Sequence, residues 1–95
     1  MITSKQRAAL RAMANPLPAI LQIGKGGICD NLLKQLDDAL EARELIKISI
    51  LETAMLDTRA TCSLLAEKLS AEPVQAIGSR LVLYRESKEN KTIVI

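Results

Sequence analysis

Apolar and polar residues alternate at helical spacing near the start of the chain. Over residues 4–14 ("SKQRAALRAMA"), Leu10 and Met13 form an apolar edge, while charged and small residues fill the other positions. Thr3 is followed three residues later by Gln6, which is the spacing of a capping box. The pattern therefore predicts a helix over residues 4–14 that ends before the proline following it.

Two further stretches show the same periodicity. The first begins at Asp30, which we expect to be the N-cap, and ends near Glu44. The second begins after Asp57 or Thr58, either of which suits the N-cap position, and ends before Pro73. The apolar positions that define these two helices are Ile28, Leu32, Leu33, Leu36, Ala39 and Leu40 in the first and Leu64, Leu65 and Leu69 in the second.

Short apolar runs between the helices have the chemistry of strands. In the second of these runs the alternation turns Lys47 and Ser49 outward, at least in part. The last two runs are separated by Gly78 and the serine after it, which suits a turn or a bulge. The final nine residues begin as a polar loop, and their last four either add an edge strand or fray. The four predicted strands cover residues 19–23, 45–51, 74–77 and 80–86.

The predicted elements follow one another in the order α-β-α-β-α-β-β. A chain of 95 residues is long enough for one small hydrophobic core, and no linker or internal repeat divides it. We therefore predict a single α/β domain over residues 1–95, in which helices pack on a mixed four-stranded sheet.

Composition excludes several kinds of site. The chain has no His, and Cys29 and Cys62 are far apart in sequence, so neither a CxxC redox pair nor a Cys/His zinc site can form. We expect two reduced thiols, buried or half-buried, and no cofactor. Tyr84 is the only aromatic residue, which excludes a stacking platform of several rings. Because strand alternation places it on the same face as Val82, we expect the ring of Tyr84 to pack in the core.

The sequence carries no sign of a membrane or of export. No apolar run approaches the roughly 20 residues needed to cross a bilayer, and the first residues lack the apolar region of a signal peptide. We expect a cytoplasmic protein without a membrane partner.

Charge is unevenly distributed along the chain. Residues 1–29 carry a net charge of +4 without one acidic residue, residues 30–72 carry −4, and residues 73–95 carry +2. Such an asymmetry points to a polyanionic partner, although charge blocks on a small domain are often only solvated faces.

The acid-free segment contains the turn Gly24-Lys25-Gly26-Gly27, which connects a predicted strand to a predicted helix. This turn lacks the complete pattern of a Walker A loop or a Rossmann fingerprint. It does have the GxxG spacing with which KH domains hold a nucleic-acid backbone. Its N–H groups can reach phosphates, the helix N-terminus adds a partial positive charge, and Lys25 adds a full one. A glycine-rich connection can equally reflect chain geometry alone.

Four blocks of sequence give the chain a resemblance to a known family. They are "TSKQRAALRAMA", "LQIGKGG", "ALEARELIKI" and "VQAIGSRLVLYRESKENK". With these blocks the chain resembles the CRM domain (chloroplast RNA splicing and ribosome maturation), in particular the free-standing bacterial YhbY-type proteins. The resemblance implies a fold similar to the C-terminal domain of bacterial translation initiation factor three. It also implies an RNA partner, the precursor of the large-subunit ribosomal RNA, with a role in assembly of that subunit and no small-molecule substrate.

The same resemblance implies which residues contact RNA. They belong to the GxxG loop, to the basic face of the first helix, and to two recurrent basic positions later in the chain. One of these, Arg43, has a structural alternative, because it can pair with Glu41 or Glu44 near the end of its helix. The residues expected to bind RNA are Gly24, Lys25, Gly26, Gly27, Lys5, Arg7, Arg11, Arg43 and Arg85.

A second class of function stays open at this point. The C-terminal residues 91–95 ("KTIVI") could form an exposed sheet edge that pairs with a strand of another protein. An enzyme is disfavoured, because the chain has no His and no local catalytic signature. We therefore predict a monomeric, non-catalytic RNA-binding protein, with a protein-interaction module as the alternative.

Overall fold

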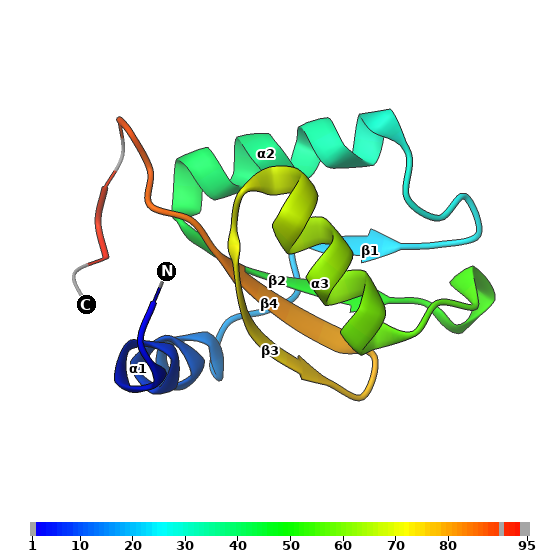
Figure 1. Cartoon of the computed structure of the whole chain (residues 1–95). Coiled ribbons are helices and arrows are strands. Elements are labelled where there is room, and N and C mark those ends of the chain that lie inside the picture. Colours follow the sequence, from blue (N-terminus) through cyan, green and yellow to red (C-terminus); the bar gives the residue numbers. More distant parts are fainter. Residues whose placement is uncertain (1, 90, 94–95) are drawn as a thin grey trace.

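The computed structural model describes residues 2–89 and 91–93. Helices and strands follow one another in the predicted order, with a short 3-10 helix, η1, before the third helix (Figure 1). The elements are α1 (Ser4–Ala14), β1 (Leu21–Ile23), α2 (Asp30–Arg43), β2 (Leu45–Ile50), η1 (Glu52–Ala54), α3 (Thr58–Leu69), β3 (Glu72–Ile77) and β4 (Arg80–Tyr84).

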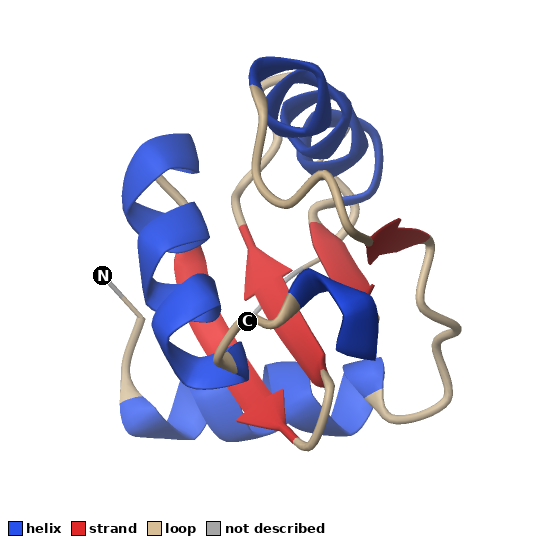
Figure 2. Ribbon diagram, turned by 90° about the vertical axis from the view of Figure 1, so that its right-hand side faces the viewer, coloured by secondary structure: helices blue, strands red, loops and turns tan. Residues whose placement is uncertain are grey.

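The strands form a four-stranded sheet in the order β1-β2-β4-β3. Strand β1 pairs parallel with β2, whereas β4 pairs antiparallel with both β2 and β3. Helices α2 and α3 pack on one face of the sheet and α1 packs on the other, so the strands lie between two layers of helix (Figure 2). The predicted α/β fold with a mixed four-stranded sheet is confirmed.

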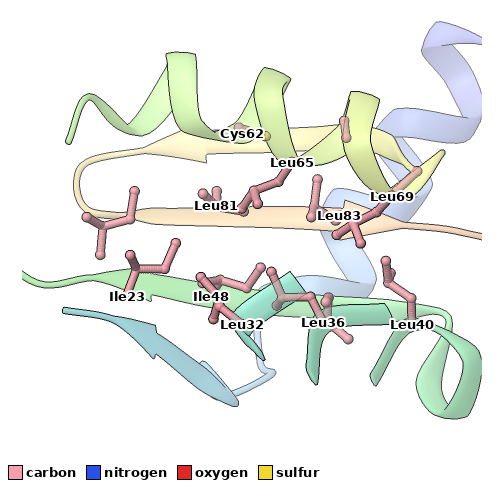
Figure 3. Close-up of a cluster of buried hydrophobic side chains, with 14 residues drawn as sticks. Ile23, Leu32, Leu36, Leu40, Ile48, Cys62, Leu65, Leu69, Leu81 and Leu83 are labelled. Carbon is pink, nitrogen blue, oxygen red and sulfur yellow. The ribbon is translucent and has the colours of Figure 1, made fainter. Parts of the chain in front are cut away.

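The larger hydrophobic core lies between the sheet and helices α2 and α3 (Figure 3). Every second residue of β2, namely Ile46, Ile48 and Ile50, points into this core, as the alternation predicts. Leu36 from α2 and Leu65 from α3 are completely buried in it. Full burial of one such side chain contributes about 1.5–3 kcal/mol, so this core holds both helices on the sheet.

A smaller cluster holds α1 on the opposite face. Leu10 of α1 is completely buried and clusters with Leu45, Val82 and Tyr84 of the sheet. Tyr84 is only 7% exposed, which confirms the predicted packing of its ring. Met13, expected on the same apolar edge as Leu10, is 39% exposed at the side of the helix.

The helix caps agree with the sequence in two cases out of three. Thr3 and Gln6 form the predicted capping box of α1, and Asp57 caps α3 with its side chain. The prediction for α2 is wrong: the N-cap is Cys29, which makes no side-chain capping bond. Asp30 is instead the first residue of the helix. Its carboxylate lies in the first turn, where it interacts favourably with the positive end of the helix dipole.

Three strands are shorter than predicted, and β3 starts two residues earlier than predicted. β1 lacks the first two residues of the predicted run, because the chain only enters the sheet there, with one hydrogen bond from the Ile20 N–H to the Lys47 carbonyl oxygen (2.9 Å). β2 ends at Ile50 and β4 ends at Tyr84, although the N–H of Arg85 still bonds to the carbonyl oxygen of Glu44 (2.9 Å), which continues the register of the two strands.

Two predictions of burial are also wrong. Leu64 is 40% exposed, since α3 turns Cys62 and Leu65 toward the sheet instead. Cys62 is buried as expected, and this burial raises the pKa of its thiol. Cys29, which was expected to be buried or half-buried, is exposed. It lies at the N-cap of α2, directly after the glycine turn.

The segment that follows β4 is held by two carboxylates at the end of α2. Glu44 is completely buried and accepts the N–H groups of Ser87 and Ile93, each at 2.9 Å, and that of Thr92. Glu41 accepts the hydroxyl of Ser87 and the N–H groups of the two residues after it. These bonds link residues more than 40 positions apart in sequence and fix the path of the chain beyond the sheet.

Only residues 91–93 of the possible edge strand at residues 91–95 are described by the structure. Residues 91–93 are not in a strand, and the N–H groups of Thr92 and Ile93 bind Glu44 rather than a sheet edge. Residues 94 and 95 lie outside the described residues.

Burial alone would raise the pKa of Glu44, but the N–H donors of Thr92, Ser87 and Ile93 together lower it below its ordinary value of 4.5. A lowered pKa in the folded state means that protonation favours unfolding. The stabilising contribution of Glu44 is therefore present above the pKa of the unfolded chain and is lost as the pH falls through the folded value.

The variant Glu44→Gln is expected to unfold several degrees below the wild type at neutral pH, because the amide nitrogen cannot accept the N–H bonds that the carboxylate accepts. The difference should shrink as the pH falls below the pKa of the unfolded chain and through the lowered folded-state pKa of Glu44, where the wild-type carboxyl becomes protonated. Thermal unfolding followed by circular dichroism measures both effects. The exposed Glu67→Gln on α3 is the control and should match the wild type. A Glu44→Gln protein as stable as the wild type at neutral pH would contradict the role assigned to this carboxylate.

Candidate nucleic-acid interface

Only one position of the glycine turn needs glycine for the backbone. The N–H of Gly27 bonds to the carbonyl oxygen of Gly24 (2.9 Å), and Gly27 has a φ of +64°, which side chains disfavour. A Cβ atom at Gly26 would meet no heavy atom within 4 Å, and one at Gly24 would make ordinary contact, 3.5 Å from Leu51 Cδ1. The fold therefore tolerates a side chain at Gly26. Because glycine has no side chain, the backbone at this position is open to an external molecule.

Lys25 lies at the tip of this turn. Its side chain is exposed and makes no hydrogen bond or ion pair within the described part of the chain. Helix α2 starts a few residues later, and its N-cap residue Cys29 leaves the first N–H groups without a side-chain acceptor. Asp30 places one carboxylate in that first turn. The tip thus offers an ammonium group and open backbone on the outer surface.

Helix α1 presents the predicted basic side chains. Lys5 and Arg11 are exposed, and α1 contains no acidic residue. Arg7 is half-buried, because its Nε donates to the carbonyl oxygen of Pro73 in β3 (3.1 Å). Arg7 therefore lies along the β3 side of the helix, with one donor already used by the protein.

The glycine turn and α1 lie at opposite ends of the molecule. Figure 1 shows α1 at one end and the turn after β1 at the other. The longest dimension of the Cα trace is 36 Å. The two predicted contact regions are consequently not one cluster, and a single partner must follow the surface between them.

A strip of sheet that α1 leaves uncovered runs between the two regions. Ser49 of β2 lies opposite Gln22 in β1 and Arg80 in β4, and Arg80 lies opposite Ile77 in β3. Residues directly opposite each other point to the same face, and Lys47, two positions before Ser49, shares that face. We call this strip the open sheet surface; it consists of Gln22, Lys47, Ser49, Ile77 and Arg80.

The open sheet surface adjoins both predicted regions. At one end the Nζ of Lys47 donates to the carbonyl oxygen of Asn15, directly after α1 (3.3 Å). At the other end β1 leads from Gln22 into the glycine turn. Lys47 and Arg80 add two cations to the surface, and none of its residues is acidic. The alternation in residues 45–51 predicts outward positions for Lys47 and Ser49, but no signal in the sequence places Arg80 beside them.

The two remaining predicted arginines differ in their surroundings. The guanidinium of Arg85 pairs with Asp37 (2.6 Å) and donates to the carbonyl oxygens of Leu69 and Asp37, each at 3.0 Å, so it ties α2 to the end of α3. Arg43 is exposed on the last turn of α2. Its considered pairing with Glu41 or Glu44 is wrong, because both carboxylates bind the segment after β4.

Residues 2–89 and 91–93 contain neither a metal site nor a membrane-spanning helix. No three Cys, Asp or Glu side chains in that part of the chain come together in a way that could hold a metal ion. None of its helices has the length and apolar character needed to cross a membrane.

The fold agrees with comparisons to known proteins. Residues 2–85 match the CRS1 / YhbY (CRM) domain, and the chain belongs to this family. It is similar to the Bacillus subtilis protein named probable RNA-binding protein YqeI, with 48% identity over 93 residues, which cover 98% of this chain and 97% of the relative. A Haemophilus influenzae protein named RNA-binding protein is 30% identical, with 95% and 91% of the two chains covered.

A solved structure supports the fold directly. The solution structure of a hypothetical protein from Staphylococcus aureus superposes on this chain with a TM-score of 0.73 at 50% sequence identity. The match covers 96% of this chain and 95% of the other.

The glycine turn makes a testable contrast between two neighbouring positions. Gly27→Ala should destabilise the protein by about 1–2 kcal/mol, because alanine disfavours the left-handed conformation. Gly26→Ala should stay within about 0.5 kcal/mol of the wild type, since its Cβ meets nothing. Urea unfolding of both variants measures the difference. Equal destabilisation at the two positions would mean that the fold, rather than a ligand, accounts for both glycines.

Proposed function

We propose that this protein binds RNA along a continuous surface made of α1, the open sheet surface and the glycine turn. The proposal rests on one observation: basic side chains follow one another along this surface, and no carboxylate lies among them. Arg11 on α1, Lys47 and Arg80 on the sheet, and Lys25 at the turn succeed one another, and residues 24–27, α1 and the open sheet surface contain no acidic residue.

Two facts support RNA as the polyanion. The chain belongs to the CRM family, and relatives that match almost its whole length carry RNA binding in their names. The turn also leaves the backbone of Gly26 exposed, where no side chain obstructs a phosphate. A basic surface alone does not distinguish RNA from other polyanions, whereas these features favour a phosphate backbone.

In the proposed mechanism, the turn and Lys25 hold phosphates at one end, and α1 holds phosphates at the other. Lys47 and Arg80 neutralise phosphates between them. Tyr84 is buried, so the described residues expose no aromatic ring for base stacking. Contacts of this kind position the backbone and follow RNA shape more than sequence. The protein acts by binding, without catalysis and without a cofactor.

The resemblance to bacterial YhbY-type proteins supports a more specific proposal. We infer that the RNA is the precursor of the large-subunit ribosomal RNA and that the protein acts as a monomer during assembly of that subunit. The alternative of a protein-interaction module at a sheet edge has less support, because edge strand β3 contains Pro73 and a bulge, features that obstruct pairing with a further strand.

The experiment that tests this function is binding to fragments of large-subunit ribosomal RNA over a series of salt concentrations. For contact with roughly three to five phosphates, log affinity should fall linearly with log salt, with a slope of about −0.7 to −0.9 per phosphate. Lys25→Glu should lower affinity about tenfold and reduce the slope by about one.

The control is Lys68→Glu, which changes the net charge equally but lies at the end of α3, on the other side of the sheet. It should change the affinity much less than Lys25→Glu. A flat salt response, or equal losses for both variants, would overturn the proposed interface.

A further inference from the structure

An apolar cavity of about 260 Å³ lies beside the end of α1. Its walls come from α1, from the segment that enters β1, from the start of β2 and from the segment after β4. Met13 and Leu17 line it and are 39% and 37% exposed, so apolar surface at its mouth is open to solvent. The other apolar lining residues are Pro18, Ile20, Leu45, Ile46 and Ile93.

Two cations stand at this cavity and no carboxylate lines it. Arg43 and Lys47 are both among the lining residues, and the lining contains no Asp or Glu. Within the described part of the chain, Arg43 makes no hydrogen bond or ion pair. The nearby carboxylate of Glu44 is buried behind Thr92 and Ile93 and accepts bonds from both. The charge at the mouth is therefore positive.

The volume of the cavity and the chemistry of its lining indicate which kind of ligand it can bind. The volume is slightly below the about 300–1,000 Å³ of pockets that hold drug-sized ligands, which leaves room for one small ring system. Apolar walls bury the faces of a planar ring, and adjacent cations attract negative charge beside it. A nucleobase with its flanking phosphates combines these two properties.

We propose that this cavity binds one unpaired nucleobase of the RNA, while Arg43 and Lys47 contact the phosphates on either side of it. The inference rests on the proposed function, because Lys47 also belongs to the open sheet surface and the cavity adjoins α1. It assigns a role to Arg43 that its unpaired position on α2 otherwise leaves unexplained. A protein without an exposed aromatic ring thereby gains a way to distinguish a bulged or looped nucleotide from a regular duplex.

The polar groups in the cavity lining indicate how selective the cavity is among bases. The hydroxyl of Thr92 donates to Glu44 (3.3 Å), and the Nζ of Lys47 is shared with the carbonyl oxygen of Asn15. Few polar groups are left to read the edge of a base, so the cavity should accept different bases with similar affinity. Recognition at this site is of an unpaired nucleotide rather than of a particular sequence.

The test uses two hairpin RNAs of equal charge density, one fully paired and one with a single bulged 2-aminopurine. The wild type should bind the bulged RNA more tightly, and 2-aminopurine fluorescence should change on binding. Leu17→Ser and Met13→Ser should each reduce affinity for the bulged RNA about fivefold and leave the paired RNA unaffected. The control Leu64→Ser removes an equally exposed leucine, 40% exposed, from α3 and should match the wild type.

A second pair of variants tests the cations. Arg43→Gln should reduce the salt slope for the bulged RNA by about one, whereas Arg59→Gln on α3 should not. Thermal unfolding shows whether each variant is folded. If one of the two cavity variants, Leu17→Ser or Met13→Ser, does not fold, the other still tests the proposal.

The outcomes separate the two proposals. If both RNAs bind the wild type equally and the cavity variants behave like the wild type, while Lys25→Glu still weakens binding, the cavity proposal is wrong and the RNA interface stands. If neither RNA binds the wild type, the proposed function fails as well. A cavity that instead receives a protein side chain would likewise give equal binding of the two RNAs.

Discussion

Helix α1 packs alone on one face of the four-stranded sheet, and its length limits how much of that face it can cover. Its eleven residues extend about 16 Å and its side chains span about 10 Å across, whereas β2 alone is about 20 Å long. The covered part of the face is apolar, with Leu45, Val82 and Tyr84. The uncovered part has to face water, and there the same strands carry Lys47, Ser49 and Arg80.

This incomplete cover gives the protein its proposed binding surface. On the other face, α2 and α3 together bury the sheet and leave no comparable strip. The glycine turn and α1 lie at opposite ends of the molecule (Figure 1), so the proposed single contact with RNA has to run over the basic strip between them. The Glu44 carboxylate contributes at the other side of α1, because it fixes the segment that forms one wall of the apolar cavity.

Features that depend on neighbouring residues were predictable from sequence. The capping box of Thr3 and Gln6, the cap at Asp57 and the alternation in β2 all act within a few positions, and the structure confirms them. The order of the strands and their register depend on contacts between distant segments. For that reason the sequence did not reveal that Arg80 lies opposite Ser49 or that the two predicted contact regions lie at opposite ends.

Two charged residues have partners that the sequence did not reveal, for the same physical reason. Glu44 lies at the end of α2, and N–H donors more than 40 positions later in the chain make its burial favourable. The resemblance predicts an RNA contact for Arg85, and the sequence did not reveal that its guanidinium binds Asp37 and two carbonyl oxygens. Charged residues that bond over long sequence distances look like surface residues when only their neighbours are considered.

The most direct test of the account is to follow backbone amide signals by nuclear magnetic resonance while RNA with a bulged nucleotide is added. The account predicts that the signals of Arg11, Lys47, Arg80 and Gly26 shift together in one titration, while the signals of α3 stay in place. Shifts confined to the glycine turn, or shifts concentrated along α3, would contradict the continuous interface over the open sheet surface.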